Sequence, residues 1–313
     1  MKSVTQVARK KGRLYYFKKS LPLTLMALPG IIIMVLFKYL PMSGMVLAFK
    51  KFSVRGGIFG SPWNGMENFQ FLFKSSDAFI ITRNTLVYNV VFIIIDLVAA
   101  VAIAIALNEL LNKKRAKFFQ TVFMAPYFLS WVVISFIAFA FLSVDKGFLN
   151  TILKTFGMET VSWYSEAKYW PFILVFFQVW KTAGYSTVMY LGSLVSIPHD
   201  YYEAACIDGA TKWQQIKFIT IPCLRSMMIV LTILAIGKIF FADFGLFYQL
   251  PRNSGPLFSA TNVIDTYVYR ALKETGNIGM AAAANLYQSL VGFVFVITSN
   301  FVVRKIDRDS ALF

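Results

Sequence analysis

Groups that most enzymes and metal sites need are scarce in this chain of 313 residues. It holds one histidine, His199, and two cysteines, Cys206 and Cys223. A single histidine excludes sites built on a histidine pair, and two distant cysteines exclude zinc ribbons and disulfide scaffolds. Neither of the glycine-rich phosphate-binding patterns, G-x-x-x-x-G-K-[ST] or G-x-G-x-x-G, occurs in the chain. If ATP drives this protein, another chain has to bind the nucleotide.

Charged residues are also few, at 15% of the chain, whereas 58% of residues are hydrophobic and the mean hydropathy is +0.62. A soluble domain is about 45–50% apolar and about 25% charged. A core of ordinary size cannot bury this much apolar surface, so the composition predicts contact with lipid. The net charge is +16, but the charges lie between long apolar runs and not on one face. No nucleic-acid partner is therefore expected.

Six apolar segments are long enough to cross a bilayer as helices, which takes about 20 residues. The chain is therefore predicted to be an all-α integral membrane protein with six transmembrane helices. The segments are about Leu21–Phe49, Leu86–Leu107, Val122–Leu142, Pro171–Val195, Ser226–Phe247 and Met280–Val303. The apolar length of the first segment exceeds that of the core of a secretion signal, and no A-x-A cleavage site follows it. We therefore expect this segment to be retained as a membrane anchor.

Lysine and arginine concentrate in the stretches that would lie on one side of the membrane. These are residues 1–20, the loop with Lys113–Lys117, the loop after the fourth segment, and the tail. Positive charge favours the cytoplasmic side, so both termini are predicted to be cytoplasmic. The predicted organisation is a basic arm (1–20), a transmembrane domain (21–305) with a distinctive loop (197–222), and a tail (306–313). The arm is expected to set topology and contact anionic lipid.

A few ionisable residues fall inside the apolar segments, where charge is expensive and usually faces protein or water. Lys38 is expected to reach toward an interface with its long side chain. Lys181 follows Trp180 and precedes Tyr185 on a polar face of the fourth segment. It could line a pathway or hold two helices together, and the sequence does not separate these roles. Asp96 is expected to make a structural hydrogen bond to a neighbouring helix.

The loop between the fourth and fifth segments has the pattern of a short helical element. Asp200 is a candidate N-cap, with Glu203 three residues later as in a capping box. One helix face is compact, and its members are Tyr202, Ala205, Cys206 and Gly209. Gly209 is the expected helix stop, and Pro222 can open the next helix. His199 is expected to be an ordinary loop residue.

Two interpretations of this loop compete. Membrane-surface helices favour lysine and arginine beside a strong apolar face, whereas this loop has balanced charge and a weak apolar face. A small-residue surface with acids at its start instead favours insertion into a groove of a partner protein. Asp208 could pair with Lys212 four residues later or contact that partner, and both roles stay open.

The spacing Glu203-Ala204-Ala205, three residues, Gly209, nine residues, then Ile219-x-Ile221-Pro222 resembles the E-A-A-x3-G-x9-I-x-L-P loop of bacterial ABC-importer permeases. Only Ile221 departs from that pattern, where the family has leucine. Three further stretches are similar to permeases for oligosaccharides and polysaccharides: Asn108-Glu109-Leu110, Trp180-Lys181-x-x-Gly184 and Asp265-Thr-Tyr-Val-Tyr-Arg270. The resemblance covers the chain from about Leu21 onward.

This resemblance implies a permease subunit of the bacterial cell membrane that forms half of a sugar pathway and performs no covalent chemistry. The partners it implies are a cytoplasmic ATPase dimer, a second and different permease, and an extracytoplasmic sugar-binding protein. No cofactor is expected on this chain, because ATP and Mg²⁺ would bind the ATPase. The residues expected to dock on the ATPase are Glu203, Ala204, Ala205, Asp208, Gly209, Ile219 and Pro222.

Sugars bind flat aromatic faces and hydrogen-bonding groups, and the chain has 32 Phe, 15 Tyr and 6 Trp. Most of these aromatics are expected to contact lipid or lie at the membrane interfaces. Where polar groups cluster with aromatics in the middle of a segment, we expect residues that line the substrate pathway. These candidates are Trp131, Trp180, Lys181, Tyr185, Asn285 and Gln288.

The alternative to an ATP-driven importer is an ion-coupled secondary transporter that uses Asp96. Such transporters usually carry paired intramembrane carboxylates and repeated or broken spans. One buried acid and six segments without an evident repeat disfavour this alternative. An integral-membrane enzyme is disfavoured as well, because the chain offers no nucleophile–base or metal constellation.

Overall fold

The computed structural model describes residues 13–70 and 76–306, and apart from one β-bridge between Lys50 and Trp63 the regular structure in this part is helical. The longer helices are α1 (Arg13–Met34), α5 (Ser76–Asn108), α6 (Lys113–Met124), α7 (Trp131–Leu142), α9 (Trp170–Val195), α12 (Ile221–Ile236) and α15 (Ile278–Ile306). The shorter α-helices are α2 (Leu40–Met42), α3 (Gly57–Gly60), α8 (Phe148–Thr155), α10 (His199–Ile207), α11 (Lys212–Gln215), α13 (Phe258–Thr261) and α14 (Ile264–Arg270).

Four helices in the described part are long and apolar enough to cross a membrane. They are Leu21–Phe49, Ala78–Asn108, Lys212–Ile236 and Ile278–Lys305. The predicted first, second and sixth segments lie in such helices. The fourth predicted segment coincides with the 26 residues of α9, which carries Lys181 and several hydroxyl side chains in its middle. The multi-pass helical architecture is confirmed, while the count of six spans and the inward orientation of the termini stay predictions.

The third predicted span, Val122–Leu142, is not one continuous helix, and that prediction is wrong. Lys113–Phe128 and Trp131–Leu142 form a pair bent by 99°. Pro126 lies in the 3₁₀ turn that ends α6, and the Ser130 hydroxyl caps α7 by accepting a hydrogen bond from the Val133 N–H at 3.3 Å. A proline cannot continue the hydrogen-bond ladder, and a serine cap starts a new helix. Apolar composition alone conceals such a break.

The fifth predicted span, Ser226–Phe247, is displaced, because the helix runs over Lys212–Ile236. It includes the π-helical turn Ile216–Thr220 just before Pro222. This wider turn makes room for the proline ring, which would otherwise clash with a carbonyl one turn earlier. Beyond Ile236, two backbone groups are satisfied by side chains: the Ala242 N–H donates to Asp265 at 2.8 Å and the Phe240 carbonyl accepts from Gln288 at 2.7 Å.

The body is organised around α5 and α9, which pack along much of their lengths. Small side chains permit the close approach: Ala100 and Ala104 on α5 are fully buried, and the Thr187 hydroxyl on α9 contacts the Ala100 carbonyl at 3.3 Å. Small residues at helix contacts are typical of membrane helices. Further along, Trp170 and Leu174 of α9 join Ile134 of α7 in the largest buried cluster.

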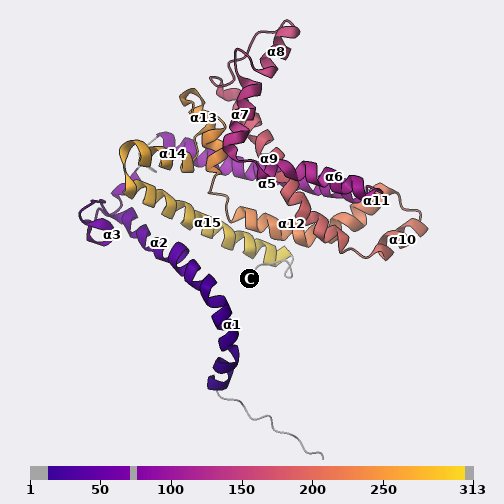
Figure 1. The fold of residues 1–313 in the computed structure, drawn as a ribbon, viewed down its shortest axis with the longest axis horizontal. Coiled ribbons are helices and arrows are strands. Elements are labelled where there is room, and N and C mark those ends of the chain that lie inside the picture. The colour runs from indigo at the N-terminus through magenta and orange to yellow at the C-terminus, as the bar shows by residue number, and fades with distance from the viewer. Residues whose placement is uncertain (1–12, 71–75, 307–313) are drawn as a thin grey trace, which may run out of the picture.

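Three parts extend away from this body (Figure 1). The first part of the N-terminal span, α1, drawn in indigo, projects away from it, whereas the end of that span, Ser43–Phe49, packs against α15 and buries Ala48. α7 and α8 rise together as a second projection, and α10 with α11 forms a tip at one end of the long helices. The predicted basic arm lies largely outside the described residues, although α1 already begins at Arg13. The predicted tail, 306–313, lies beyond them except for its first residue.

Candidate functional site

The loop of residues 197–222 forms a compact hairpin of two short helices, α10 and α11. α10 ends at Ile207, and Gly209 follows with a φ of +78°. That left-handed conformation favours glycine because other residues place a Cβ against the backbone. The Ala210 N–H then donates to the Ala205 carbonyl at 2.9 Å, which closes the helix end. The prediction that Gly209 stops the helix is confirmed.

The start of α10 differs from the prediction. The residue before the helix is Pro198, which makes no side-chain cap hydrogen bond, and Asp200 lies within the first turn. The N-cap assigned to Asp200 is therefore wrong, because proline's fixed φ begins the helix earlier. Glu203 instead approaches His199, with Oε1 and Nε2 3.9 Å apart. A capping box does exist one helix later, where Thr211 and Gln214 exchange hydrogen bonds.

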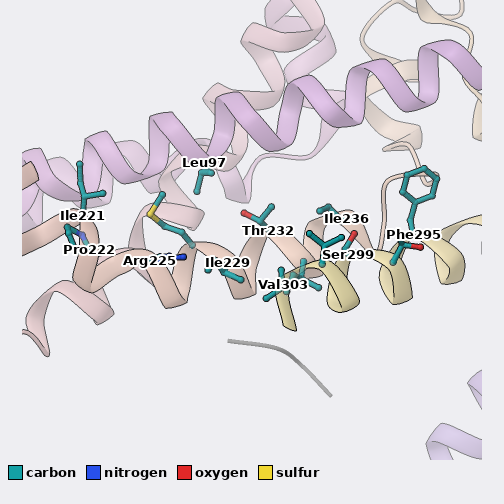
Figure 2. Close-up of a pocket in the computed structure, with 14 residues that line it drawn as sticks. Leu97, Ile221, Pro222, Arg225, Ile229, Thr232, Ile236, Phe295, Ser299 and Val303 are labelled. Carbon is teal, nitrogen blue, oxygen red and sulfur yellow. The ribbon is translucent and has the colours of Figure 1, made fainter. Parts of the chain in front are cut away.

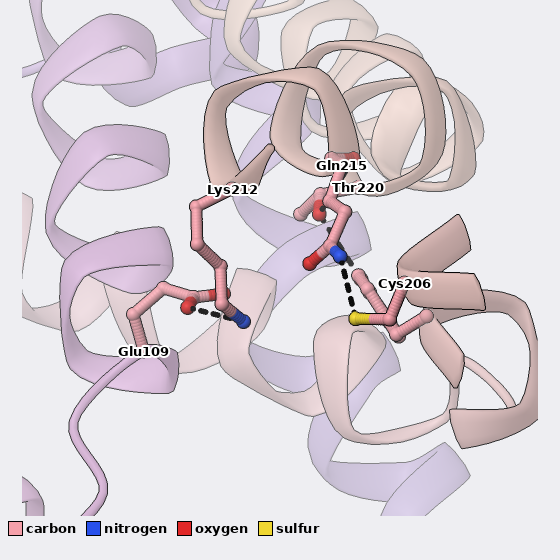
Figure 3. A network of polar contacts seen from close by, with 6 residues as sticks. Glu109, Cys206, Lys212, Gln215 and Thr220 are labelled. Atoms are coloured by element: carbon pink, nitrogen blue, oxygen red, sulfur yellow. Dashed lines mark hydrogen bonds and ion pairs between the residues drawn. The ribbon is translucent and has the colours of Figure 1, made fainter. Parts of the chain in front are cut away.

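The predicted small-residue face of α10 is partly turned toward its own chain (Figure 3). The Tyr202 hydroxyl lies 3.0 Å from the Thr220 hydroxyl, and the Gln215 amide donates to Cys206 Sγ at 3.0 Å. Tyr202 is half-buried and Gln215 is 3% exposed. These contacts fasten α10 to the start of the next long helix. Cys206 and Gly209 of this face nevertheless stay exposed, so only its Tyr202 end is turned inward.

The exposed face carries acids and large apolar groups. Among the predicted docking residues, Glu203, Ala204, Asp208, Gly209 and Pro222 are exposed, and Ala205 and Ile219 are half-buried. Beside them lie two large apolar side chains that sequence reasoning did not assign: Ile207 is 87% exposed and Trp213 is 71% exposed. Exposed large apolar groups rimmed by acids are typical of a surface that binds protein. Their place in the hairpin between two long helices was the signal available in the sequence.

An ion pair joins this hairpin to the second long helix. Lys212 Nζ lies 3.2 Å from Glu109 Oε2, just after the end of α5 (Figure 3). Lys212 thus pairs with Glu109 and not with Asp208, the partner considered from the sequence. Because α11 continues into α12 as one helix, the hairpin is tied to α5 at one point and is covalently continuous with the fifth span. A movement of the hairpin is therefore passed to two long helices.

Three of the six candidate pathway residues meet where α7 and α9 approach the bend of the third span. Tyr185 stacks on Tyr127 with ring centroids 4.4 Å apart. Lys181 Nζ donates to the Tyr127 carbonyl at 2.9 Å and also to the Leu129 carbonyl. Trp131 Nε1 donates to the Asp243 carboxylate at 2.8 Å. Lys181 therefore joins α9 to the bent backbone, and its place in a substrate pathway stays a prediction.

The other three candidates lie apart from this cluster. Trp180 packs edge-on against Phe177 and borders two apolar cavities. Gln288 is 1% exposed and donates to the Phe240 carbonyl and to Asp265, at 2.7 and 3.1 Å. Asn285 is exposed on α15. Sequence reasoning did not assign Tyr127 and Asp243, because their contacts with Tyr185, Lys181 and Trp131 join segments that are far apart in the sequence.

Asp96 accepts two hydrogen bonds across the α5–α9 contact. The donors are the hydroxyls of Thr182 at 2.9 Å and Ser186 at 2.7 Å. A half-buried carboxyl group with two interhelical donors joins helices, as predicted. An apolar groove of about 780 Å³ lies further along, between α12 and α15 (Figure 2). It begins beside Pro222 and extends past Thr232 to Phe295.

Known proteins match nearly the whole chain. Residues 78–308 match the family described as "Binding-protein-dependent transport system inner membrane component". Protein LplB of Bacillus subtilis is 32% identical over 287 residues, which are 92% of this chain and 90% of LplB. The polygalacturonan/rhamnogalacturonan transport system permease protein YteP of the same species is 34% identical, over 92% of this chain and 89% of YteP.

A solved structure has the same fold. The crystal structure of a bacterial ABC transporter involved in the import of the acidic polysaccharide alginate matches with a TM-score of 0.86 at 30% identity, covering 95% of this chain and all of that chain. The same transporter type in complex with an alginate pentasaccharide-bound periplasmic protein matches with a TM-score of 0.85. The chain accordingly belongs to the binding-protein-dependent transport system inner membrane components, as a multi-pass permease subunit of an ABC importer.

Proposed function

We propose that this chain forms half of the membrane pathway of an importer of oligosaccharides or polysaccharides, and that the 203–222 loop docks on a separate ATPase. The observation that carries this proposal is the hairpin itself. Its outer face exposes Glu203, Asp208 and Ile207, while its inner face is fixed to the rest of the chain. A surface that is exposed but rigidly mounted suits force transfer from a partner.

The proposed mechanism needs no covalent chemistry on this chain. ATP and Mg²⁺ bind the ATPase dimer, whose closure moves the docked hairpins. The continuous helix Lys212–Ile236 and the Glu109–Lys212 ion pair then carry the movement into the spans. ATP and sugar each favour one of two states, inward- or outward-facing, which makes their binding reciprocally coupled.

The remaining partners follow from the same assignment. A second permease, a different chain, completes the pathway, and an extracytoplasmic binding protein delivers the sugar on the side opposite the hairpin. In that orientation both termini are cytoplasmic and the hairpin faces the cytoplasm. Support for a sugar substrate comes from YteP, named for polygalacturonan and rhamnogalacturonan transport, and from the importer of the acidic polysaccharide alginate. The Asp96-driven ion transporter is disfavoured, because that carboxylate is committed to Thr182 and Ser186.

A co-purification experiment tests the docking surface. The tagged chain is isolated in mild detergent as wild type, as Glu203→Lys and as Glu159→Lys, which makes the same charge change at an exposed site away from the hairpin. We expect the ATPase to accompany wild type and Glu159→Lys and to be lost with Glu203→Lys. Equal recovery of the ATPase with all three forms would contradict the proposal.

A further inference from the structure

A further cavity, separate from those described above, lies at the far end of α5. It measures about 480 Å³, and it is lined by Arg83, Asn84, Tyr88, Lys168, Pro171 and Ser259. These residues come from α5, the turn before α9, the first turn of α9, and α13. From Arg83 to the end of α5 is 25 residues, about 37 Å of helix, and the docking hairpin lies at that other end (Figure 1). The cavity and the hairpin therefore lie at opposite ends of α5.

The cavity has a positively charged rim. The Arg83 guanidinium donates from Nε and Nη2 to the Asn84 side-chain oxygen, at 3.2 and 2.9 Å. Asn84 is itself 5% exposed and held by the carbonyls of Ser259 and Asn262. The guanidinium is thus oriented by a fixed neighbour. Within the described residues it has no carboxylate in ion-pair contact.

Two further features add to the attraction for an anion. Lys168 stands at the rim, where it pairs with Glu166 at 2.7 Å and lies over the Tyr169 ring. Pro171 marks the first turn of the 26-residue α9, and the N-terminal end of a helix carries partial positive charge. Glu166 forms its ion pair with Lys168 and therefore neutralises the charge of Lys168, but not that of Arg83.

We infer that this cavity receives a carboxylate-bearing sugar unit, a uronate, with its carboxylate on Arg83. A planar guanidinium matches a carboxylate in geometry, and the volume accommodates one monosaccharide with water. Tyr88 also lines the cavity as part of a fixed wall, because its ring packs against Phe92 and Phe247 and its hydroxyl donates to the Ala260 carbonyl at 2.9 Å. This subsite rests on the proposed function, since it presumes a saccharide substrate, and it specifies an acidic one.

The test measures discrimination between two matched probes. The complete importer and its binding protein are reconstituted in proteoliposomes, and uptake of trigalacturonate is compared with uptake of its methyl ester, which lacks the charges. The variants are Arg83→Gln and Lys154→Gln; the latter removes one exposed positive charge from α8. The binding protein is the same in every assay, so its own preference cancels when variants are compared.

The measured quantity is the uptake rate of trigalacturonate divided by that of its methyl ester, both at concentrations below KM. We expect this ratio to fall about fivefold in Arg83→Gln and to be unchanged in Lys154→Gln. Arg83→Lys should retain part of the preference. An equal loss of uptake for both probes in Arg83→Gln would overturn the subsite. It would leave the substrate class standing, and it would assign Arg83 a structural role or a contact with an acid of the binding protein. If the wild type takes up neither probe, the acidic saccharide class fails together with the subsite.

Discussion

The ion pair between Glu109 and Lys212 gives a quantitative test of how the hairpin is connected to the spans. The two charges are 3.2 Å apart, and the side chains are 33% and 72% exposed. Unit charges at that distance attract by about 1.3 kcal/mol in water and about 5 kcal/mol at an effective dielectric constant of 20. Solvent screening and side-chain entropy reduce exposed pairs to roughly 0.2–1 kcal/mol. The half-exposed geometry therefore predicts about 1 kcal/mol, or about fivefold in an equilibrium constant.

Charge reversal separates this interaction from general damage. Glu109→Lys and Lys212→Glu each lose the attraction and add a repulsion, so each should reduce sugar-stimulated ATP hydrolysis of the reconstituted importer about five- to tenfold. The double variant restores an attractive pair with the opposite polarity and should return to within about twofold of wild type. A double variant as impaired as the worse single one would refute the proposed connection.

Three further outcomes follow from local geometry. Gly184→Ala should prevent correct packing, because a Cβ there would overlap the Phe123 carbonyl, whereas Gly192→Ala on the same helix meets nothing within 4 Å; folded yield by size exclusion tests the pair. Asp96→Asn keeps an acceptor for Thr182 and Ser186 and should leave ATP-driven uptake within about threefold; abolished uptake would revive the ion-coupled mechanism. His199→Gln should be neutral in the same assay, because the His199–Glu203 contact is 3.9 Å long and both side chains are over 60% exposed.

The location of the hairpin was predictable because its signal is local. The spacing from Glu203 to Pro222 is fixed along the chain, and Gly209 adopts the positive φ that its position demands. The cap at Asp200 was mispredicted because α10 begins directly after Pro198, whose fixed φ starts the helix before Asp200. Which face of α10 points outward depends on the contacts of Tyr202 and Cys206 with a later segment, and spacing within one helix does not contain that information.

Contacts between distant segments account for most of what the sequence could not reveal. Nothing in the sequence around Lys212 indicates Glu109 as its partner. The break of the third span and the early end of the fifth are stabilised from elsewhere, by Lys181 and by Asp265 and Gln288. Membrane backbone can depart from a helix only when other groups satisfy it. Apolar length therefore predicted where spans lie more reliably than where they bend.

Site-directed cross-linking tests the central claim most directly, namely that the hairpin is the surface that meets the ATPase. In a Cys206→Ser, Cys223→Ser background, a cysteine replaces Ile207 on the hairpin or Phe156 just after α8, which are 87% and 77% exposed. A short bifunctional thiol–amine reagent is then applied to membranes containing the complete importer. The account predicts a cross-link to the ATPase from Ile207→Cys and none from Phe156→Cys. A cross-link to the ATPase from Phe156→Cys alone would contradict both the docking surface and the orientation.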